Sequence, residues 1–182
     1  MKKGKNCMKS CRTMFFYFLS TVLLVSLPWG SPSAAQTKDP RLTAEGAVKS
    51  FYTFHFSHSK DSRLKNIGQR RRWLTSELDD LLLAEYQRED REQTTHPDEV
   101  PYIEGDVFTD SQEYPTTFRL GKVDTAEDRA KVTVTFIWRE KTKEVDRRDE
   151  VLEVVLRNGK WLINDLVSSD GRKLNDLLKR KE

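Results

Sequence analysis

The amino-acid sequence predicts an α+β fold in which helices come first and a meander of antiparallel strands follows. Within residues 43–57 and 75–89 apolar side chains recur at helical spacing, whereas from residue 116 onward they alternate with polar ones. Asn158-Gly159 joins two of the alternating runs and is a strong hairpin signal. Because hairpins join antiparallel strands, we expect N-terminal helices packed on one face of a curved antiparallel sheet, with a short C-terminal helix.

The first 35 residues have the character of a secretory signal peptide. They hold five basic residues and no acidic one, and an apolar run covers residues 14–27. Ser33 and Ala35 place small side chains at the −3 and −1 positions of a cut after Ala35. The run is shorter than the roughly 20 residues that a helix needs to cross a bilayer, although an uncleaved membrane anchor is the alternative.

The cysteine positions exclude a lipid anchor. Both cysteines precede the apolar run, so neither can carry a lipid once the signal is removed. We therefore expect a cysteine-free chain that is exported to the periplasm or the exterior, is not lipid-anchored and depends on its core for stability.

The charge balance disfavours a nucleic-acid partner. The 182 residues hold 32 Lys or Arg against 29 Asp or Glu, a net charge of +3. Without the five basic residues of the signal, 27 basic side chains face 29 acidic ones, and the net charge becomes −2. One basic segment remains: Lys60, Arg63, Lys65, Arg70, Arg71 and Arg72. Its ordinary interpretation is a solvated face, and its functional one is weak contact with a membrane surface.

After a short tether over residues 36–41, residues 42–182 form a single domain with two early helices. The first begins after Thr43, a plausible N-cap, and ends near Ser57. Its apolar side comprises Ala44, Ala47, Val48, Phe51, Tyr52 and His55. The second begins at Thr75 or Ser76 and ends in a charged run by Glu89.

The other elements follow from alternation and turn residues. Residues 59–72 read as irregular, and residues 93–115 as a long loop with room for one short strand. Strands are expected over 116–122, 132–139, 152–157 and 161–167, with a last helix from about Asp170.

Four segments of this chain resemble the nuclear-transport-factor-2-like superfamily, and in particular a bacterial family of exported domains of unknown function, number 3828 in that series. They are Phe51-Tyr52, Trp73–Leu78, Gly105–Thr109 with Gln112, and Gly159–Leu166. The resemblance covers roughly residues 42–180. It implies a curved sheet wrapped around helices into a cone, a pocket at the mouth of the cone, and a homodimer through the outer sheet face. It implies no particular reaction, because the superfamily includes isomerases, dehydratases and binding modules.

The residues that we expect at a ligand pocket are Tyr52, His55, Trp138, Trp161 and Asp165, with Asp106 and Gln112 in the loop. His55 has either an acid–base role near neutral pH or a structural role with a single hydrogen bond. Asp165 is either a desolvated general base, or a carboxylate that pairs with an Arg or caps a helix.

No metal or cofactor is expected. His55 and His58 are one turn apart, but the third histidine, His96, lies in a loop without a fixed partner. The acidic residues between Asp106 and Glu113 lack the order of a calcium loop, and the glycine patterns of nucleotide-binding sites are absent.

Two functions remain open. The first is a non-catalytic module that binds a small ligand or an envelope protein through the cone mouth or the outer sheet face. The second is an acid–base enzyme of the isomerase, dehydratase or hydrolase kind with His55 and Asp165 as partners. We expect the first, and assign no catalytic residue.

Overall fold

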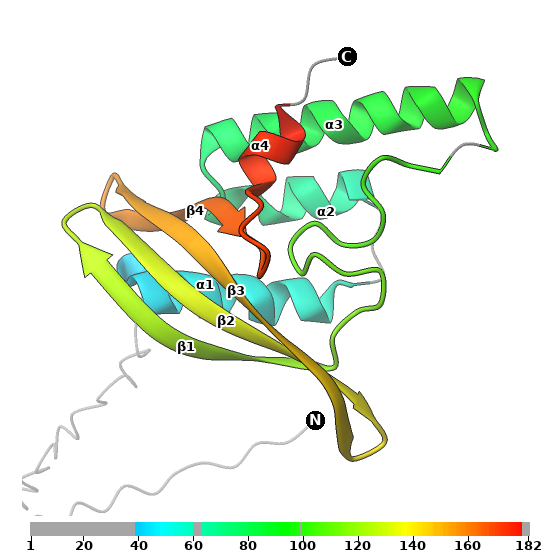
Figure 1. Ribbon diagram of the computed structural model, residues 1–182. Helices are drawn as coiled ribbons and strands as arrows, with labels where there is room; N and C mark the ends of the chain where they lie inside the picture. The colour runs from blue at the N-terminus through cyan, green and yellow to red at the C-terminus, as the bar shows by residue number, and fades with distance from the viewer. Residues whose placement is uncertain (1–38, 60–62, 99, 180–182) are drawn as a thin grey trace, which may run out of the picture. The chain divides into compact units, whose positions relative to one another are not determined.

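The computed structural model describes residues 39–59, 63–98 and 100–179. The expected signal peptide and residues 36–38 of the expected tether lie outside these ranges. The expected α+β class is confirmed, since helices precede an antiparallel sheet and a short helix follows it (Figure 1). In chain order the helical elements are η1 (Pro40–Leu42), α1 (Ala44–Ser57), α2 (Arg63–Arg70), η2 (Arg71–Trp73), α3 (Ser76–Thr95) and α4 (Leu174–Leu178).

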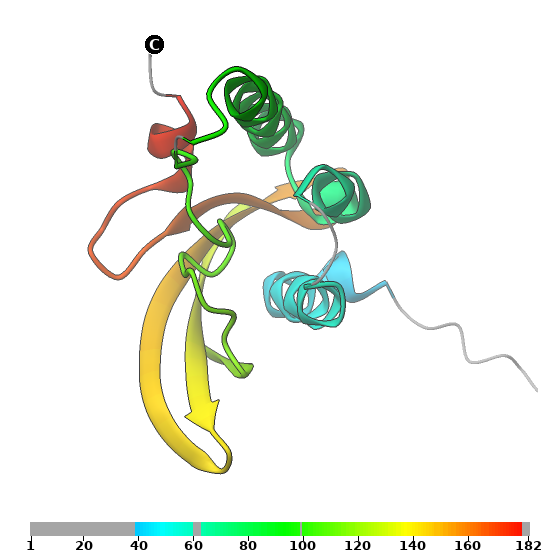
Figure 2. The same cartoon turned by 90° about the vertical axis from the view of Figure 1, so that its right-hand side faces the viewer.

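The sheet has four antiparallel strands in the order in which they occur along the chain. They are β1 (Thr117–Ala126), β2 (Arg129–Glu140), β3 (Lys143–Arg157) and β4 (Lys160–Val167). Asn158 and Gly159 connect β3 to β4 with positive φ angles of 51° and 74°, as a tight hairpin turn requires. The sheet curves, and α1 lies on the inner side of the curve, where it contacts all four strands (Figure 2).

The core lies between α1 and the inner face of the sheet. The side chain of Thr43 caps α1 by accepting a hydrogen bond from the Gly46 amide at 3.0 Å. All six residues of the expected apolar stripe are buried, and five of them, all but His55, belong to one core cluster with Val132, Val134 and Phe136 of β2. The apolar residues that recur periodically in α1 and β2 therefore predicted the position of the core.

The helical region extends further than the sequence indicated. Residues 63–70 form α2, and α3 continues to Thr95 instead of ending by Glu89. The inner side of α3 carries carboxylates as well as leucines: Glu85 and Glu89 are buried, and Glu89 accepts a hydrogen bond from the Ile103 amide at 3.0 Å. The part of α3 that the sequence did not indicate, residues 90–95, is exposed throughout, so no apolar period marks it.

Strand β3 also begins earlier than expected, at Lys143. Its first part pairs with the end of β2 as far as Glu140↔Lys143, although residues 143–147 are all exposed. Where both faces of a hairpin are exposed to solvent, its residues show no apolar alternation. The sequence therefore predicts only the buried part of β3. Among the described residues, no helix combines the length and apolar character needed to cross a bilayer.

Candidate functional site

A buried hydrogen-bonded cluster centred on His55 lies at the C-terminal end of α1. His55 is 1% exposed, and its Nε2 lies 3.0 and 3.1 Å from the two carboxylate oxygens of Asp106. The hydroxyl of Tyr114 lies 2.5 Å from the same nitrogen. On the other side of the ring, Nε of Arg70 donates to Nδ1 at 2.6 Å. The cluster thus joins α1, α2 and the loop that precedes β1.

The loop is folded tightly enough to hold Asp106 in place. The carboxylate of Asp106 accepts a hydrogen bond from the Phe108 amide at 2.8 Å, and its backbone forms an isolated bridge with Ser111. Gly105 adopts a φ of +79°, and a Cβ there would overlap the carbonyl oxygen of Ser111. Glycine is required at this position both for its conformation and for the close backbone approach.

The electrostatics of the cluster favour an ionised Asp106 and a neutral Tyr114. Burial alone would raise the pKa of Asp106, but the charge and hydrogen bond of His55, with the Phe108 amide, lower it below its ordinary value. Burial and the nearby Asp106 raise the pKa of Tyr114 far above its ordinary value. The phenol is therefore a hydrogen-bonding group and not a source of protons or a nucleophile at neutral pH.

Both ring nitrogens of His55 are engaged by the protein itself. Because Arg70 donates to Nδ1, a neutral ring carries its proton on Nε2. From there the N–H group donates hydrogen bonds to Asp106 and Tyr114. No lone pair of the ring is left to take a proton from a substrate. The arrangement is a structural joint, by which we mean that His55 holds α1, α2 and the loop before β1 together. Among the described residues, no group of three or more His, Cys, Asp or Glu side chains could hold a metal ion.

Three further residues expected at the pocket fix the same loop. The buried Tyr52 donates from its hydroxyl to the Phe108 carbonyl at 2.7 Å. Gln112 donates to the carboxylate of Glu104, and the indole of Trp138 donates to the Glu113 carbonyl at 2.8 Å. Gln112 and Trp138 also line one hollow of about 400 Å³ beside the β2–β3 hairpin, to which Asp110, Glu113, Asp146 and Arg148 contribute charge.

Trp161 and Asp165 lie apart from this cluster. Trp161 pairs with Leu156 in the core, near the β3–β4 turn, whereas Trp138 lies at the opposite end of the sheet. The carboxylate of Asp165 accepts hydrogen bonds from the amides of Leu166 and Asn175, at 2.9 and 3.0 Å.

Asp165 therefore caps the start of α4, which was one of its two expected roles. Burial raises its pKa above the ordinary value, against the lowering effect of these two amides. His55 and Asp165 share no hydrogen-bond partner in the described part of the chain.

The basic segment does not form one face. Arg70 is completely buried, and Arg71 pairs with Asp79 at 2.7 Å. The guanidinium of Arg72 lies 3.9 Å from the ring centroid of Trp73. Lys60 and the side chains of Arg63 and Lys65 lie outside what the structure describes.

Two members of the His55 cluster, Arg70 and Tyr114, were not among the expected site residues, and neither was Glu150 of β3. Glu150 is 1% exposed, and neither of its carboxylate oxygens has a hydrogen-bond partner among the described residues. Burial, followed by the negative charge of Asp110, raises its pKa to about 8. The only sequence signal for it was a carboxylate at an inward position of an alternating strand.

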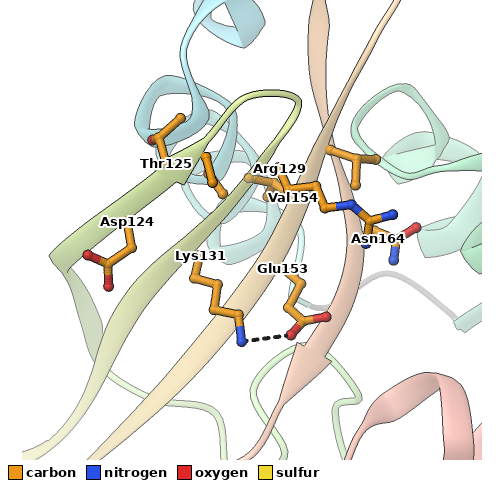
Figure 3. Close-up of a pocket in the computed structure, with 10 residues that line it drawn as sticks. Asp124, Thr125, Arg129, Lys131, Glu153, Val154 and Asn164 are labelled. Atoms are coloured by element: carbon orange, nitrogen blue, oxygen red, sulfur yellow. Dashed lines mark ion pairs between the residues drawn. The ribbon is translucent and has the colours of Figure 1, made fainter.

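A second hollow, of about 390 Å³, crosses all four strands at the end of the sheet near the β1–β2 turn (Figure 3). Strand alternation places Arg129, Lys131 and Glu153 on the outer face, away from α1, because Ala130, Val132 and Leu152 belong to the core. Ala126 and Val155 lie on this outer face, and Ala130 and Val154, which belong to the core, also line the hollow. Mostly apolar walls with a few polar groups are typical of small-ligand sites.

The comparisons with known proteins add no relative. No protein-family model, no curated protein and no solved structure matches this chain.

Proposed function

We propose that this chain is a non-catalytic module that binds a small ligand in the hollow on the outer face of the sheet. The observation that carries the proposal is the hollow itself, a cavity of about 390 Å³ to which every strand contributes and of which four of the ten lining residues are apolar. Its volume lies in the range of roughly 300 to 1,000 Å³ that is usual for ligand sites.

The His55 cluster supports binding over catalysis. An enzyme needs a titratable group that can reach a substrate, whereas both nitrogens of His55 are bonded within the protein and Asp165 caps a helix. The hollow beside Trp138 is a poorer ligand site, because only two of its eight lining residues, Trp138 and Val145, are apolar, against four of ten in the outer-face hollow. We therefore place the ligand on the outer face and not at the end where His55 lies.

The proposal includes the nuclear-transport-factor-2-like cone. A curved sheet with α1 on its inner side supports it. It also includes export, for which the basic start, the apolar run and the small residues at Ser33 and Ala35 argue. Mass spectrometry of the protein recovered from a bacterial periplasm should then give a chain beginning at Gln36, and an intact N-terminus would contradict cleavage.

The binding proposal is tested by a titration of the full chain, labelled with ¹⁵N, against a panel of acidic, neutral and basic small molecules. At least one class should shift the amides of Ala126, Val155 and Asn164, which line the hollow. Shifts confined to Tyr114 and Trp138, together with turnover of the compound, would instead support the enzyme. A panel without any shift in the hollow would contradict the proposal.

A further inference from the structure

We infer that the ligand of the outer-face hollow is a monocarboxylate with an apolar body, whose carboxylate is bound by Arg129. This inference rests on the proposed function and names the chemical class of its ligand. It follows from two neighbouring rows of side chains that cross the sheet.

One row is apolar apart from Arg129. The cross-strand partners Ala126↔Arg129, Arg129↔Val155 and Val155↔Leu162 place these four residues side by side across the sheet. Although Val155 lies on the outer face, it is only 5% exposed. Ala126 and Val155 of this row line the hollow, and the buried Val155 gives it a sheltered apolar surface against which a hydrocarbon or aromatic body would lose contact with water.

The adjacent row is charged, and its charges are already paired. Asp124, Lys131 and Glu153 are cross-strand partners. Lys131 pairs with Glu153 at 3.2 Å (Figure 3). Lys173 pairs with the other oxygen of Glu153 at 3.3 Å, and Lys122 pairs with Asp124 at 2.7 Å.

Arg129 differs from these neighbours. Its side chain makes no ion pair or hydrogen bond with any residue that the structure describes, and the adjacent Asp128 pairs with Arg157 at 3.4 Å. In Figure 3 the Arg129 side chain extends across the hollow in the direction of Asn164. The hollow thus presents an unpaired guanidinium and a side-chain amide beside an apolar floor.

This combination selects a carboxylate. The guanidinium presents parallel N–H donors that match the two oxygens of a carboxylate, and the amide of Asn164 can supply a further donor. One unpaired positive charge balances one negative charge. A phosphate dianion would keep an unbalanced charge close to Asp124 and Glu153, which disfavours it.

The test compares octanoate with octanamide, its neutral counterpart of the same shape, by calorimetry and by ¹⁵N titration of the full chain. Octanoate should shift the amides of Ala126, Val155 and Asn164. Octanamide should bind with an affinity at least about tenfold lower. Arg129→Gln should remove this preference, and Arg129→Lys should keep part of it, because the charge remains and the paired donors do not.

Arg91→Gln is the matched control. It removes the same charge from an exposed position on α3, outside the hollow, and should leave octanoate binding unchanged. Thermal unfolding of each variant verifies that it is folded. Equal affinity for octanoate and octanamide in the hollow would overturn the inference while the proposed function stands. Absence of shifts with both compounds would also overturn it, and the wider panel then decides whether the hollow binds any ligand.

Discussion

Arg70 and His55 are joined by a hydrogen bond of 2.6 Å from Nε of the guanidinium to Nδ1 of the ring, with the Arg70 side chain fully closed off from solvent. The bond determines which ring nitrogen is the acceptor, and it ties α2 to α1. Since Asp106 is bonded to the other nitrogen, the loop before β1 is held through the same ring. We therefore expect the hydrogen bonds of His55 with Arg70 and Asp106 to stabilise the folded chain.

Replacing Arg70 by Met should lower the free energy of unfolding by about 1 to 3 kcal/mol, because Nδ1 of the buried His55 ring would lose its hydrogen-bond donor. Urea denaturation measures the change. Arg91→Met removes an exposed arginine from α3 and should change stability by only about 0.5 kcal/mol. If the two variants were equally stable, the cluster would not be a structural joint.

Gly105 and Gly171 form a matched pair for the tight loop. Both have positive φ angles, 79° and 86°, but an added Cβ meets the Ser111 carbonyl only at Gly105 and finds open space at Gly171. Gly171→Ala should therefore cost about 1 kcal/mol for its backbone conformation alone. Gly105→Ala should cost about 1 to 3 kcal/mol more, because the loop must shift. Equal losses in urea denaturation would contradict the close packing of this loop.

Asp165 should act on stability through its acceptor oxygen. Asp165→Ala leaves the amides of Leu166 and Asn175 without their acceptor, and should cost about 1 to 2 kcal/mol. Asp165→Asn keeps an oxygen at the same place and should cost less. Hydrogen exchange at the Asn175 amide reports the cap directly, and should speed up more in the Ala variant. An equal effect of both changes would assign the role to the charge.

The sequence predicted the elements whose apolar period is intact. The stripe of α1, the alternation of β2 and the Asn158-Gly159 turn all mark a single buried face or a required backbone conformation. The last residues of α3, 90–95, were missed because all of them are exposed, so no apolar period marks them. Apolar periodicity marks only the residues whose side chains are buried against the core, and residues 143–147 of β3 were missed for the same reason.

Less of the His55 cluster and of the outer-face hollow could be predicted from the sequence. His55 and Asp106 were each singled out, but their bond joins residues 51 positions apart, and Tyr114 is 59 positions from His55. Such pairs depend on how the loop packs against α1, which local patterns do not encode. The outer-face hollow depends on the curvature of the sheet and on the register shift between Glu153 and Val154. Neither follows from the alternation of single residues.

Glu150 makes stability depend on pH. Its carboxyl faces groups from every neighbouring part of the fold, namely Tyr52 of α1, Asp106 and Asp110 of the loop, Arg148 of β3 and Asp170 after β4. Burial is the largest effect, and it raises the pKa from an ordinary 4.5 to about 8. The folded chain therefore holds this proton in a range where the unfolded chain has released it.

Because the pKa of Glu150 is higher in the folded chain than in the unfolded chain, the free energy of unfolding decreases as the pH rises. The contribution of the protonated Glu150 is complete below about pH 4.5 and is lost as the pH rises to about 8. Within that window the free energy of unfolding should fall by up to about 1.4 kcal/mol per pH unit. Glu150→Gln keeps a neutral side chain of the same shape at every pH, so it should remove this slope.

Urea denaturation at pH 5, 6.5 and 8 measures the difference between the two proteins, and other titrating groups cancel because both proteins have them. Glu150→Gln should match the wild type near pH 5 and exceed it in stability at pH 8. Glu140→Gln, at an exposed position of β2, should instead run parallel to the wild type. Parallel curves for Glu150→Gln would mean that the carboxyl ionises freely, and hence that loop and sheet open to water around it.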